Sequence, residues 1–331
     1  MRYPITFQLA LLTLLAFSQA LTSVRAAEEG GDARQWLNRM SQSVRSLNYE
    51  GTFVYRRGDT LVGMHITHVV DKQGERERLV TLNGVRREVI RDHNGVTCIL
   101  PDQNLVVVSK GRLEKPFPTK LLEDPKVIAA HYDITDMGLN RTMGQKTQVI
   151  NIKPHDKYRY GYRVWIDQET GLMLQSDVVN KEGKIMEQIM FTSLRLLDKA
   201  PASMEQEVHP AVNTVLKSNM SKLVSDDHKW LVTHMPDGFR LVEHRKRTRQ
   251  SNDHAVSMDH LVFTDGLASV SVFIENQLTP SQAVPMVGVS HLGAVNAYRT
   301  IVGKHQVTVV GEVPVSTVQL IGKSISYHVV Q

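Results

Sequence analysis

The amino-acid sequence predicts an α+β protein in which two antiparallel-sheet domains follow one another along the chain. Three observations support this prediction. Most of the 331 residues fall into short segments in which apolar and polar side chains alternate with a period of two. Turn-forming residues separate these segments at short intervals. The alternation is lost over residues 201–225, which is typical of a linker between two domains.

The composition is that of a folded protein. Apolar residues make up 41% of the chain and charged residues 22%, and there is one cysteine. These proportions exclude a disordered chain, a collagen-like repeat and a polytopic membrane protein. The formal net charge of +5 mildly favours anionic partners. Nucleic acid is not an expected partner, because the basic residues are not gathered with aromatic or groove-reading motifs.

The first 26 residues are predicted to be a secretory signal peptide. Arg2 precedes an apolar run over residues 5–17, and small residues follow near a cleavage site after Ala26. The run is shorter than the roughly 20 residues that span a bilayer, which favours cleavage over anchoring. The mature chain is therefore expected in an exported, oxidising compartment. There the lone Cys98 can form no internal disulfide, and we interpret it as a small buried side chain rather than a reactive thiol.

An amphipathic helix is the first element expected in the mature chain. Asp32 is the predicted N-cap. Trp36, Met40, Val44 and Leu47 follow at spacings of four, four and three, which places one apolar stripe along the helix. This stripe is expected to cover a sheet.

An antiparallel meander is predicted after the helix. The segment 49–55 alternates with a period of two, and Arg57-Gly58-Asp59 forms the first turn. Residue 171 is a glycine in a turn that requires positive φ. Residues 116–133 are less regular. The further predicted strands of this domain are 61–70, 78–82, 85–91, 96–100, 105–109, 146–152, 158–166, 171–180 and 184–196.

The second predicted domain covers residues 226–331. The small-residue segment 288–298 is interpreted as a helix. A last helix is expected after Pro314, with Val315, Val318, Ile321 and Ile325 on one side. The predicted strands of this domain are 230–234, 239–243, 256–263, 267–275 and 306–310.

No enzyme motif is found in the sequence. His65 and His68 lie three apart on a predicted strand, so their side chains point to opposite faces and cannot share a metal ion. The sequence has no HExxH, no GxSxG elbow, no GxGxxG and no P-loop. Glu75 and Glu77 are flanked by arginines and are interpreted as solvated charge. We therefore predict no catalytic residue, no metal and no cofactor.

One group of side chains on the predicted strands of the first domain favours a binding function. A half-open sheet under a helix leaves room for an apolar hollow, and flexible methionines tolerate acyl chains of varied shape. The alternative, that these side chains fill the core, stays open. The pocket candidates are Phe53, Tyr55, Met64, Ile66, Met173, Met186 and Met190.

A basic run in the second domain is the other binding candidate. It covers residues 244–249, at the end of a predicted strand. Such a run can meet acidic residues of a partner or the phosphates of a lipid headgroup. A solvated hairpin tip explains it equally well. The partner-binding candidates are Arg245, Lys246, Arg247, Arg249 and Phe239.

Read together, these segments resemble the RseB/MucB family of periplasmic regulators of the envelope-stress sigma factor, sigma-E. Each segment is structural, and it is their occurrence in the same order along the chain that makes the resemblance specific. The matching segments are 36–40, 47–55, 74–80, 87–92, 162–167, 170–172, 235–239, 265–273, 293–298 and 307–314.

The resemblance implies a fold and a function. Residues 27–200 are then similar to the LolA/LolB lipoprotein carriers, with an unclosed antiparallel barrel that senses lipid, and residues 226–331 form an α+β domain that binds the anti-sigma factor. The implied partner is the periplasmic domain of an RseA- or MucA-type anti-sigma-E factor, which the protein shields from the site-1 protease. Lipopolysaccharide or mislocalised lipoprotein releases it. The family implies no catalytic residue.

The resemblance also implies a place in the cell and a mechanism. The protein is expected in the periplasm, peripheral to the inner membrane through its partner, with a homodimer as a further possibility. A lipid that prefers the partner-free arrangement lowers affinity for the partner, and the angle between the domains carries this coupling. The rival function is a periplasmic lipid or lipoprotein carrier, against which the second domain argues. An exported hydrolase is less favoured because no nucleophile motif is present.

Overall fold

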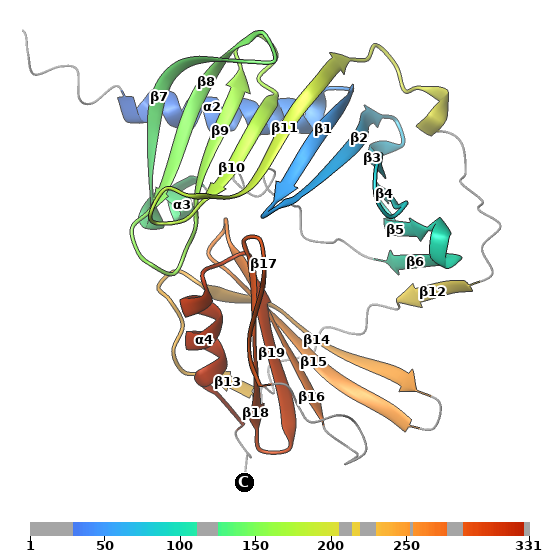
Figure 1. The fold of residues 1–331 in the computed structure, drawn as a ribbon, viewed down its shortest axis with the longest axis vertical. Coiled ribbons are helices and arrows are strands. Elements are labelled where there is room, and N and C mark those ends of the chain that lie inside the picture. The colour runs from blue at the N-terminus through green and yellow to red at the C-terminus, as the bar shows by residue number, and fades with distance from the viewer. Residues whose placement is uncertain are drawn as a thin grey trace, which may run out of the picture.

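Two sheet domains make up the described part of the protein (Figure 1). The structure, a computed structural model, describes residues 29–110, 125–204, 214–218, 230–251, 254–276 and 287–327. The predicted signal peptide lies outside these residues. The predicted fold class is confirmed, because an unclosed antiparallel sheet with helices is followed by a smaller domain with its own sheet and helix.

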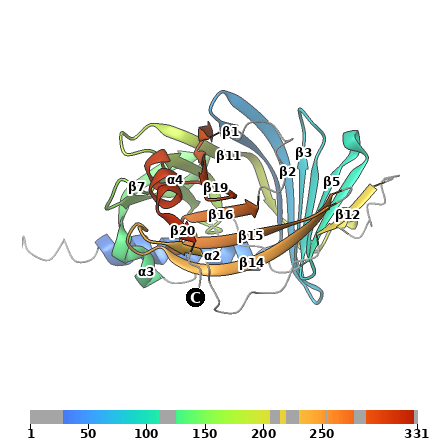
Figure 2. The same cartoon turned by 90° about the horizontal axis from the view of Figure 1, so that it is seen from below.

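A curved twelve-stranded sheet forms the N-terminal domain, in the order β12-β6-β5-β4-β3-β2-β1-β11-β10-β9-β8-β7. Its neighbouring strands are antiparallel except for β12, which pairs parallel to β6. The edge strands β7 and β12 do not pair with each other among the described strands, so the sheet curves round without closing (Figure 2). Its elements are α2 (Glu29–Ser46), β1 (Tyr49–Arg57), β2 (Thr60–Asp71), β3 (Gly74–Thr81), β4 (Glu88–Asp92), β5 (Gly95–Leu100), the 3-10 turn η1 (Pro101–Gln103), β6 (Leu105–Lys110), α3 (Pro125–His131), β7 (Tyr132–Thr142), β8 (Gln145–Pro154), β9 (Gly161–Asp167), β10 (Met173–Val179), β11 (Ile185–Leu196), the 3-10 turn η3 (Ala202–Met204) and β12 (Thr214–Ser218).

The helix α2 packs across the sheet beside β7 and β8. Its side chains Ala33, Leu37 and Met40 are buried in one apolar cluster with side chains from the middle of β8 and β9. Of the predicted stripe, Met40 is buried in this cluster and Trp36 and Val44 pack against it, whereas Leu47 lies beyond the end of the helix at Ser46. The predicted N-cap is wrong, because α2 begins at Glu29 and the backbone is already helical through Asp32.

A six-stranded antiparallel sheet forms the C-terminal domain, in the order β14-β15-β16-β19-β18-β17. The helix α4 packs on β18 and β19, and a two-stranded sheet of β13 and β20 lies beside them. Buried side chains of α4, such as Val318 and Ile321, share a core with β16 and β19. The elements are β13 (Trp230–Val232), β14 (Arg240–Ser251), β15 (His254–Thr264), β16 (Ser269–Asn276), β17 (Gly288–Leu292), β18 (Val295–Val302), β19 (His305–Gly311), α4 (Val315–Lys323) and β20 (Ile325–Tyr327).

Two sequence-based interpretations of secondary structure are corrected. The segment 288–298 is not a helix: it belongs to the hairpin of β17 and β18, which turns at Gly293 with φ of +62°. The irregular stretch before residue 146 contains the edge strand β7, which was not predicted from the sequence. Its alternation is weak because Met137 and Leu139 are exposed and the pairing with β8 shifts register between Asp136 and Leu139.

The stretch predicted as linker contains an ordered strand. Residues 214–218 form β12 on the edge of the N-terminal sheet, so this part of the stretch 201–225 belongs structurally to the first sheet. Cys98, expected to be buried, is half-buried in β5, which lies toward the β12 edge of the sheet and away from α2.

Candidate functional site

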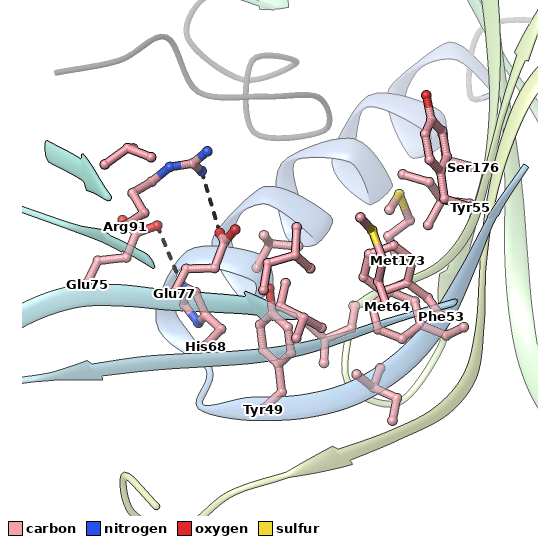
Figure 3. Close-up of a pocket in the computed structure, with 18 of the residues that line it drawn as sticks. Tyr49, Phe53, Tyr55, Met64, His68, Glu75, Glu77, Arg91, Met173 and Ser176 are labelled. Atoms are coloured by element: carbon pink, nitrogen blue, oxygen red, sulfur yellow. Dashed lines mark ion pairs between the residues drawn. The ribbon is translucent and has the colours of Figure 1, made fainter. Parts of the chain in front are cut away.

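A pocket of about 720 Å³ opens on the side of the N-terminal sheet that carries α2. Strands β1, β2 and β3 form one wall and β10 and β11 form the other, with Val44 of α2 also in the lining. Figure 3 shows aromatic and methionine side chains gathered at one end of the pocket and charged side chains at the other. The arrangement fits a molecule with an apolar and a polar part.

Side chains alternate between the two faces of β1 and β2, and this alternation brings apolar side chains of both strands to the pocket face. Phe53 and Met64 are direct register partners across the two strands, and both line the pocket. The rings of Phe53 and Phe191 lie 5.3 Å apart across β1 and β11. At Gly51 a Cβ atom would lie 2.5 Å from the backbone oxygen of Ser193, so only glycine allows β1 and β11 to approach this closely.

Five of the seven pocket candidates line this pocket: Phe53, Tyr55, Met64, Ile66 and Met173. The other two, Met186 and Met190, are not part of the lining. On β11 the side chains of Glu187, Ile189 and Phe191 line the pocket, so Met190, which lies between Ile189 and Phe191, points to the opposite face of the sheet. Met190 is 38% exposed, and Met186 packs against the cluster of buried side chains that includes α2.

Much of the lining was not among the residues predicted from the sequence. Strand alternation offered a signal for the residues on the same faces as the predicted ones, but it does not say which distant strands meet. The missed apolar lining residues are Val44, Tyr49, Leu79, Val96, Leu172, Val178, Ile189, Phe191 and Leu194.

The polar end of the pocket is formed by β2, β3 and β4. His68 Nε2 lies 3.5 Å from Glu75 Oε1, and Arg91 Nη1 lies 3.5 Å from Glu77 Oε2 (Figure 3). Glu75 and Glu77, interpreted from sequence as solvated charge, thus line the pocket together with Arg91. Burial raises the pKa of the Tyr49 hydroxyl beside them, and the charges of Glu77 and Glu75 raise this pKa further.

One wall of the pocket also touches the C-terminal domain. Glu187, which is 5% exposed, lines the pocket and accepts a hydrogen bond from the Tyr55 hydroxyl. Its Oε1 accepts a second hydrogen bond, of 2.8 Å, from the backbone N–H of Ala294 in the β17–β18 turn. Arg57 Nε lies 3.6 Å from the same carboxylate. Burial and the hydrogen bond to Glu187 raise the pKa of Tyr55.

A buried ion pair joins the two domains at another place. Arg159 and Asp265 have fully buried side chains, and Arg159 Nε donates to Asp265 Oδ2 over 2.5 Å. Arg159 also donates to Asp156 and to the backbone oxygen of Asp237. The Tyr132 hydroxyl donates to Asp265 over 2.9 Å. Every charge in this cluster therefore has partners, which is the condition for burying charge without a large penalty.

Further hydrogen bonds cross the same domain boundary. Asn296 Nδ2 donates to the Tyr160 hydroxyl over 3.0 Å, and Thr317 Oγ1 donates to the backbone oxygen of Tyr158 over 2.7 Å. Burial raises the pKa values of the boundary tyrosines Tyr132 and Tyr160. The two domains are therefore docked through buried polar contacts.

The structure separates the five partner-binding candidates. Phe239 is 9% exposed and lies under Arg159, whose guanidinium carbon is 4.9 Å from the ring centroid, so it is part of the domain boundary. Arg245 pairs with Glu243, and Lys246 is exposed. The side chains of Arg247 and Arg249 lie outside the described residues. The basic run lies within β14, paired with β15, and not at a hairpin tip.

The side chains that commonly bind metal ions lie apart in the described part of the chain. No group of three or more His, Cys, Asp or Glu side chains comes together there as a metal site. In the same residues, no helix combines the length and the apolar character that crossing a membrane requires.

Comparisons with known proteins give one consistent family. The model of the MucB/RseB N-terminal domain matches residues 32–212, and the model of the MucB/RseB C-terminal domain matches residues 224–326. The chain is 34% identical over 328 residues to the sigma factor AlgU regulatory protein MucB of Pseudomonas aeruginosa, covering 96% of each chain. It is 27% identical to the sigma-E factor regulatory protein RseB of Haemophilus influenzae, covering 96% of this chain and 98% of the relative. A crystal structure of MucB in complex with MucA(peri) superposes with a TM-score of 0.68 at 31% identity, over 90% of this chain and 100% of that chain.

Proposed function

The chain belongs to the MucB/RseB family, and from this premise we propose that it is a periplasmic regulator of sigma-E type signalling that binds the periplasmic domain of an RseA- or MucA-type anti-sigma factor. The observation that carries the proposal is the agreement over both domains with MucB, which has been crystallised with MucA(peri). Bound in this way, the anti-sigma segment is shielded from the site-1 protease. The proposed role is one of binding, without catalysis.

We assign the domains as the sequence suggested: residues 27–200 sense lipid, residues 201–225 connect, and residues 226–331 contribute to anti-sigma binding. The two family matches support this division, since they end and begin at residues 212 and 224. The signal-like residues 1–26 support export to the periplasm. Within the connecting stretch, β12 stays with the first sheet.

The pocket is the proposed site for an acyl chain of lipopolysaccharide or of a mislocalised lipoprotein. Its lining is apolar along β1, β2 and β11, and its volume of about 720 Å³ matches the 300–1,000 Å³ that is usual for ligand pockets. Side chains such as Met64 and Met173 adapt to chains of different shape. Transfer of an acyl chain into this lining is favourable by about 0.8 kcal/mol per buried methylene.

The contacts of Glu187 support a mechanism by which an acyl chain bound in the pocket lowers the affinity for the anti-sigma segment. Its carboxylate belongs both to the pocket and to the domain boundary, where it accepts from Ala294 N–H. A ligand that displaces Tyr55 changes the hydrogen bonds of Glu187. This includes the hydrogen bond by which Glu187 holds the β17–β18 turn of the C-terminal domain. Coupling is reciprocal, so a partner that prefers the docked arrangement lowers affinity for the lipid.

The test replaces Met64 by Glu and uses Met190→Glu as the matched control. Both methionines lie on the same sheet, but Met64 lines the pocket and Met190 is exposed away from it. We expect Met64→Glu to abolish release of the anti-sigma segment by lipid A fragments and to leave binding of the segment intact. Met190→Glu should change neither. Protection of the segment from the protease and its release are measured together.

Two results would contradict the proposal. A wild-type protein that does not bind the purified anti-sigma segment lacks the proposed function. A folded Met64→Glu variant that loses segment binding and lipid response equally shows that the pocket is not a separate site. The carrier alternative is favoured by the same pocket, and it predicts acyl-chain binding with no affinity for the segment.

A further inference from the structure

The polar end of the pocket indicates what kind of headgroup enters with the chain. We infer that the group formed by His68, Glu75, Glu77 and Arg91 receives the primary ammonium group of an amphiphile, whose alkyl or acyl chain lies against the apolar lining. The inference rests on the proposed function of the pocket and adds the chemistry of its polar end.

The acidic and basic side chains of strand β3 lie on opposite faces of the sheet. Its alternation places Glu75, Glu77 and Leu79 in the pocket lining, whereas Arg76 and Arg78 point to the opposite face. There the arginines are paired: Arg76 Nη2 lies 2.5 Å from Asp71, and Arg78 Nε lies 2.6 Å from Glu88. The basic side chains of β3 are therefore engaged away from the pocket, while its acids face the ligand space.

The polar end carries an excess of negative charge. Glu75, Glu77 and Asp92 line it together with one guanidinium, that of Arg91, and the imidazole of His93. Arg91 is paired with Glu77 at 3.5 Å, and Asp92 Oδ1 accepts the backbone N–H groups of Asn94 and Gly95. Glu75 Oε1 lies 3.5 Å from Nε2 of His68, and His93 lines the same end of the pocket. A phosphate entering here would meet like charge, and an ammonium would meet opposite charge.

His68 adds a buried acceptor to the same place. The residue is 1% exposed, its ring stacks on Tyr49 with centroids 4.8 Å apart, and its Nδ1 lies 2.9 Å from the backbone oxygen of Leu47. A carbonyl oxygen only accepts, so Nδ1 carries the proton and Nε2 of the neutral ring carries a lone pair. Nε2 is buried and has no hydrogen-bond partner among the described residues. It lies 3.5 Å from the Glu75 carboxylate.

Two neighbouring acceptors, the buried Nε2 of His68 and the solvent-accessible carboxylate of Glu75, match an ammonium group. A primary ammonium offers three N–H donors, one for Nε2 of His68 and one for the carboxylate of Glu75, with a third toward solvent or Glu77. A buried acceptor without a donor is costly, and a charge-assisted hydrogen bond removes that cost. In Figure 3 these side chains lie on the far side of Tyr49 from Met64 and Phe53, so the headgroup and the chain occupy opposite ends of the pocket.

The experiment compares three probes of equal chain length on the full mature protein: dodecylamine, dodecanol and dodecanoate. Each displaces a neutral fluorescent probe from the pocket, below the concentration at which micelles form. We expect dodecylamine to bind about tenfold more tightly than dodecanoate, with dodecanol between them. In the Glu75→Gln, Glu77→Gln double variant the amine should lose this preference.

The matched control is Glu88→Gln, which removes a carboxylate from the opposite face of the same strands, where it is paired with Arg78. It should leave the order of the three probes unchanged. Binding of dodecanoate as tightly as dodecylamine, or an amine preference that survives in the double variant, would overturn the inference while the pocket itself stands. Failure of all three probes to bind would overturn the proposed pocket function and the inference with it.

A primary ammonium can come from a zwitterionic phospholipid headgroup or from a simple amine. Lysophosphatidylethanolamine and lysophosphatidylglycerol with the same acyl chain separate these sources. Tighter binding of the ethanolamine lipid identifies the phospholipid ammonium as the group received. A preference that appears with dodecylamine and not with the phospholipids assigns the site to an ammonium without an adjacent phosphate.

Discussion

Arg159 is the residue whose surroundings are most informative about how the two domains stay docked. Its guanidinium is fully buried, and it contacts Asp156 and Tyr132 in its own domain and Asp265, Phe239 and the backbone of Asp237 in the other. Removing one partner of a buried pair leaves the other charge without compensation. The domain boundary therefore depends on this one side chain more than on any exposed ion pair.

The first prediction concerns the substitution Arg159→Met, which preserves much of the apolar part of the side chain. The unpaired Asp265 should lower the free energy of unfolding by about 3–5 kcal/mol, measured by urea denaturation. The control is Arg86→Met, which breaks the exposed pair with Asp102 at 2.8 Å and should change stability little. Equal loss in the two variants would show that burial of the Arg159 pair is not what matters.

The second prediction concerns Tyr55, which reports on the coupling through Glu187. Tyr55→Phe removes the hydroxyl that donates to Glu187 and preserves the ring in the lining. We expect acyl-chain binding to persist, and the factor by which lipid A fragments weaken anti-sigma binding to fall by about threefold or more. The measurement is segment affinity by titration, with and without the lipid fragment.

Tyr49→Phe is the control for this measurement. Tyr49 lines the same pocket and stacks on His68, and no hydrogen bond is described between it and Glu187. Its variant should retain the full coupling factor. If both variants weaken coupling alike, the effect belongs to the pocket as a whole and not to the contact with the C-terminal domain.

Among the elements, the β17–β18 hairpin determines how closely the domains approach. Its turn residue Gly293 has φ of +62°, and a Cβ atom there would lie 2.2 Å from Cγ of Arg57 and 2.6 Å from Oε1 of Glu187. The next residue, Ala294, is fully buried in the core cluster of the N-terminal domain. A hairpin of the second domain thus completes the packing of the first.

The third prediction compares Gly293→Ala with Gly303→Ala. Gly303 turns the neighbouring β18–β19 hairpin with φ of +59°, and a Cβ atom there meets nothing within 4 Å. Both variants have the strain of an alanine at positive φ, about 1 kcal/mol. Gly293→Ala should lose a further 1–3 kcal/mol, roughly, through overpacking at the domain boundary. Urea denaturation of both variants gives the difference, and equal midpoints would contradict the close approach.

In strand β3, the role of each charged side chain depends on what covers its face of the sheet. In sequence, Glu75-Arg76-Glu77-Arg78 reads as a solvated strand. In the sheet, its neighbours provide acids for the two arginines on one face, and a pocket for the two glutamates on the other. The same residues are thus surface charge or ligand contacts according to what covers each face.

Over the whole molecule, buried tyrosines make the docked structure sensitive to alkaline pH. Burial raises the pKa values of Tyr132 and Tyr162, and nearby acids raise them further, Asp265 for Tyr132 and Glu312 for Tyr162. The folded state thus retains protons that the unfolded state releases near pH 10. Their contribution to stability is fully present below about pH 10 and is lost as pH rises above it.

The fourth prediction follows from this direction of shift. Stability toward urea should fall between about pH 9 and pH 11, and the fall should be smaller in Tyr132→Phe and Tyr162→Phe, because phenylalanine does not ionise. The exposed Tyr327 provides the control, since its replacement by Phe should leave the fall unchanged. A pH dependence identical in all of these variants would rule out Tyr132 and Tyr162 as its source.

The sequence by itself determined which side chains share a strand face, the amphipathic character of α2 and the family, because periodicity and ordered motifs are local and survive without coordinates. It placed Phe53, Tyr55, Met64 and Ile66 on one face of neighbouring strands, which the structure places in the pocket lining. A period of two says that side chains alternate, and it does not say which face of a distant strand is covered.

Only the tertiary structure decided the rest. It left Met186 and Met190 out of the pocket lining, placed Phe239 under Arg159, and brought Glu187 against Ala294, 107 residues further along the chain. Each of these outcomes depends on contacts between segments that are far apart in sequence. Such contacts are selected by how whole faces pack and by which buried charges find partners, and no local pattern in the chain records that selection.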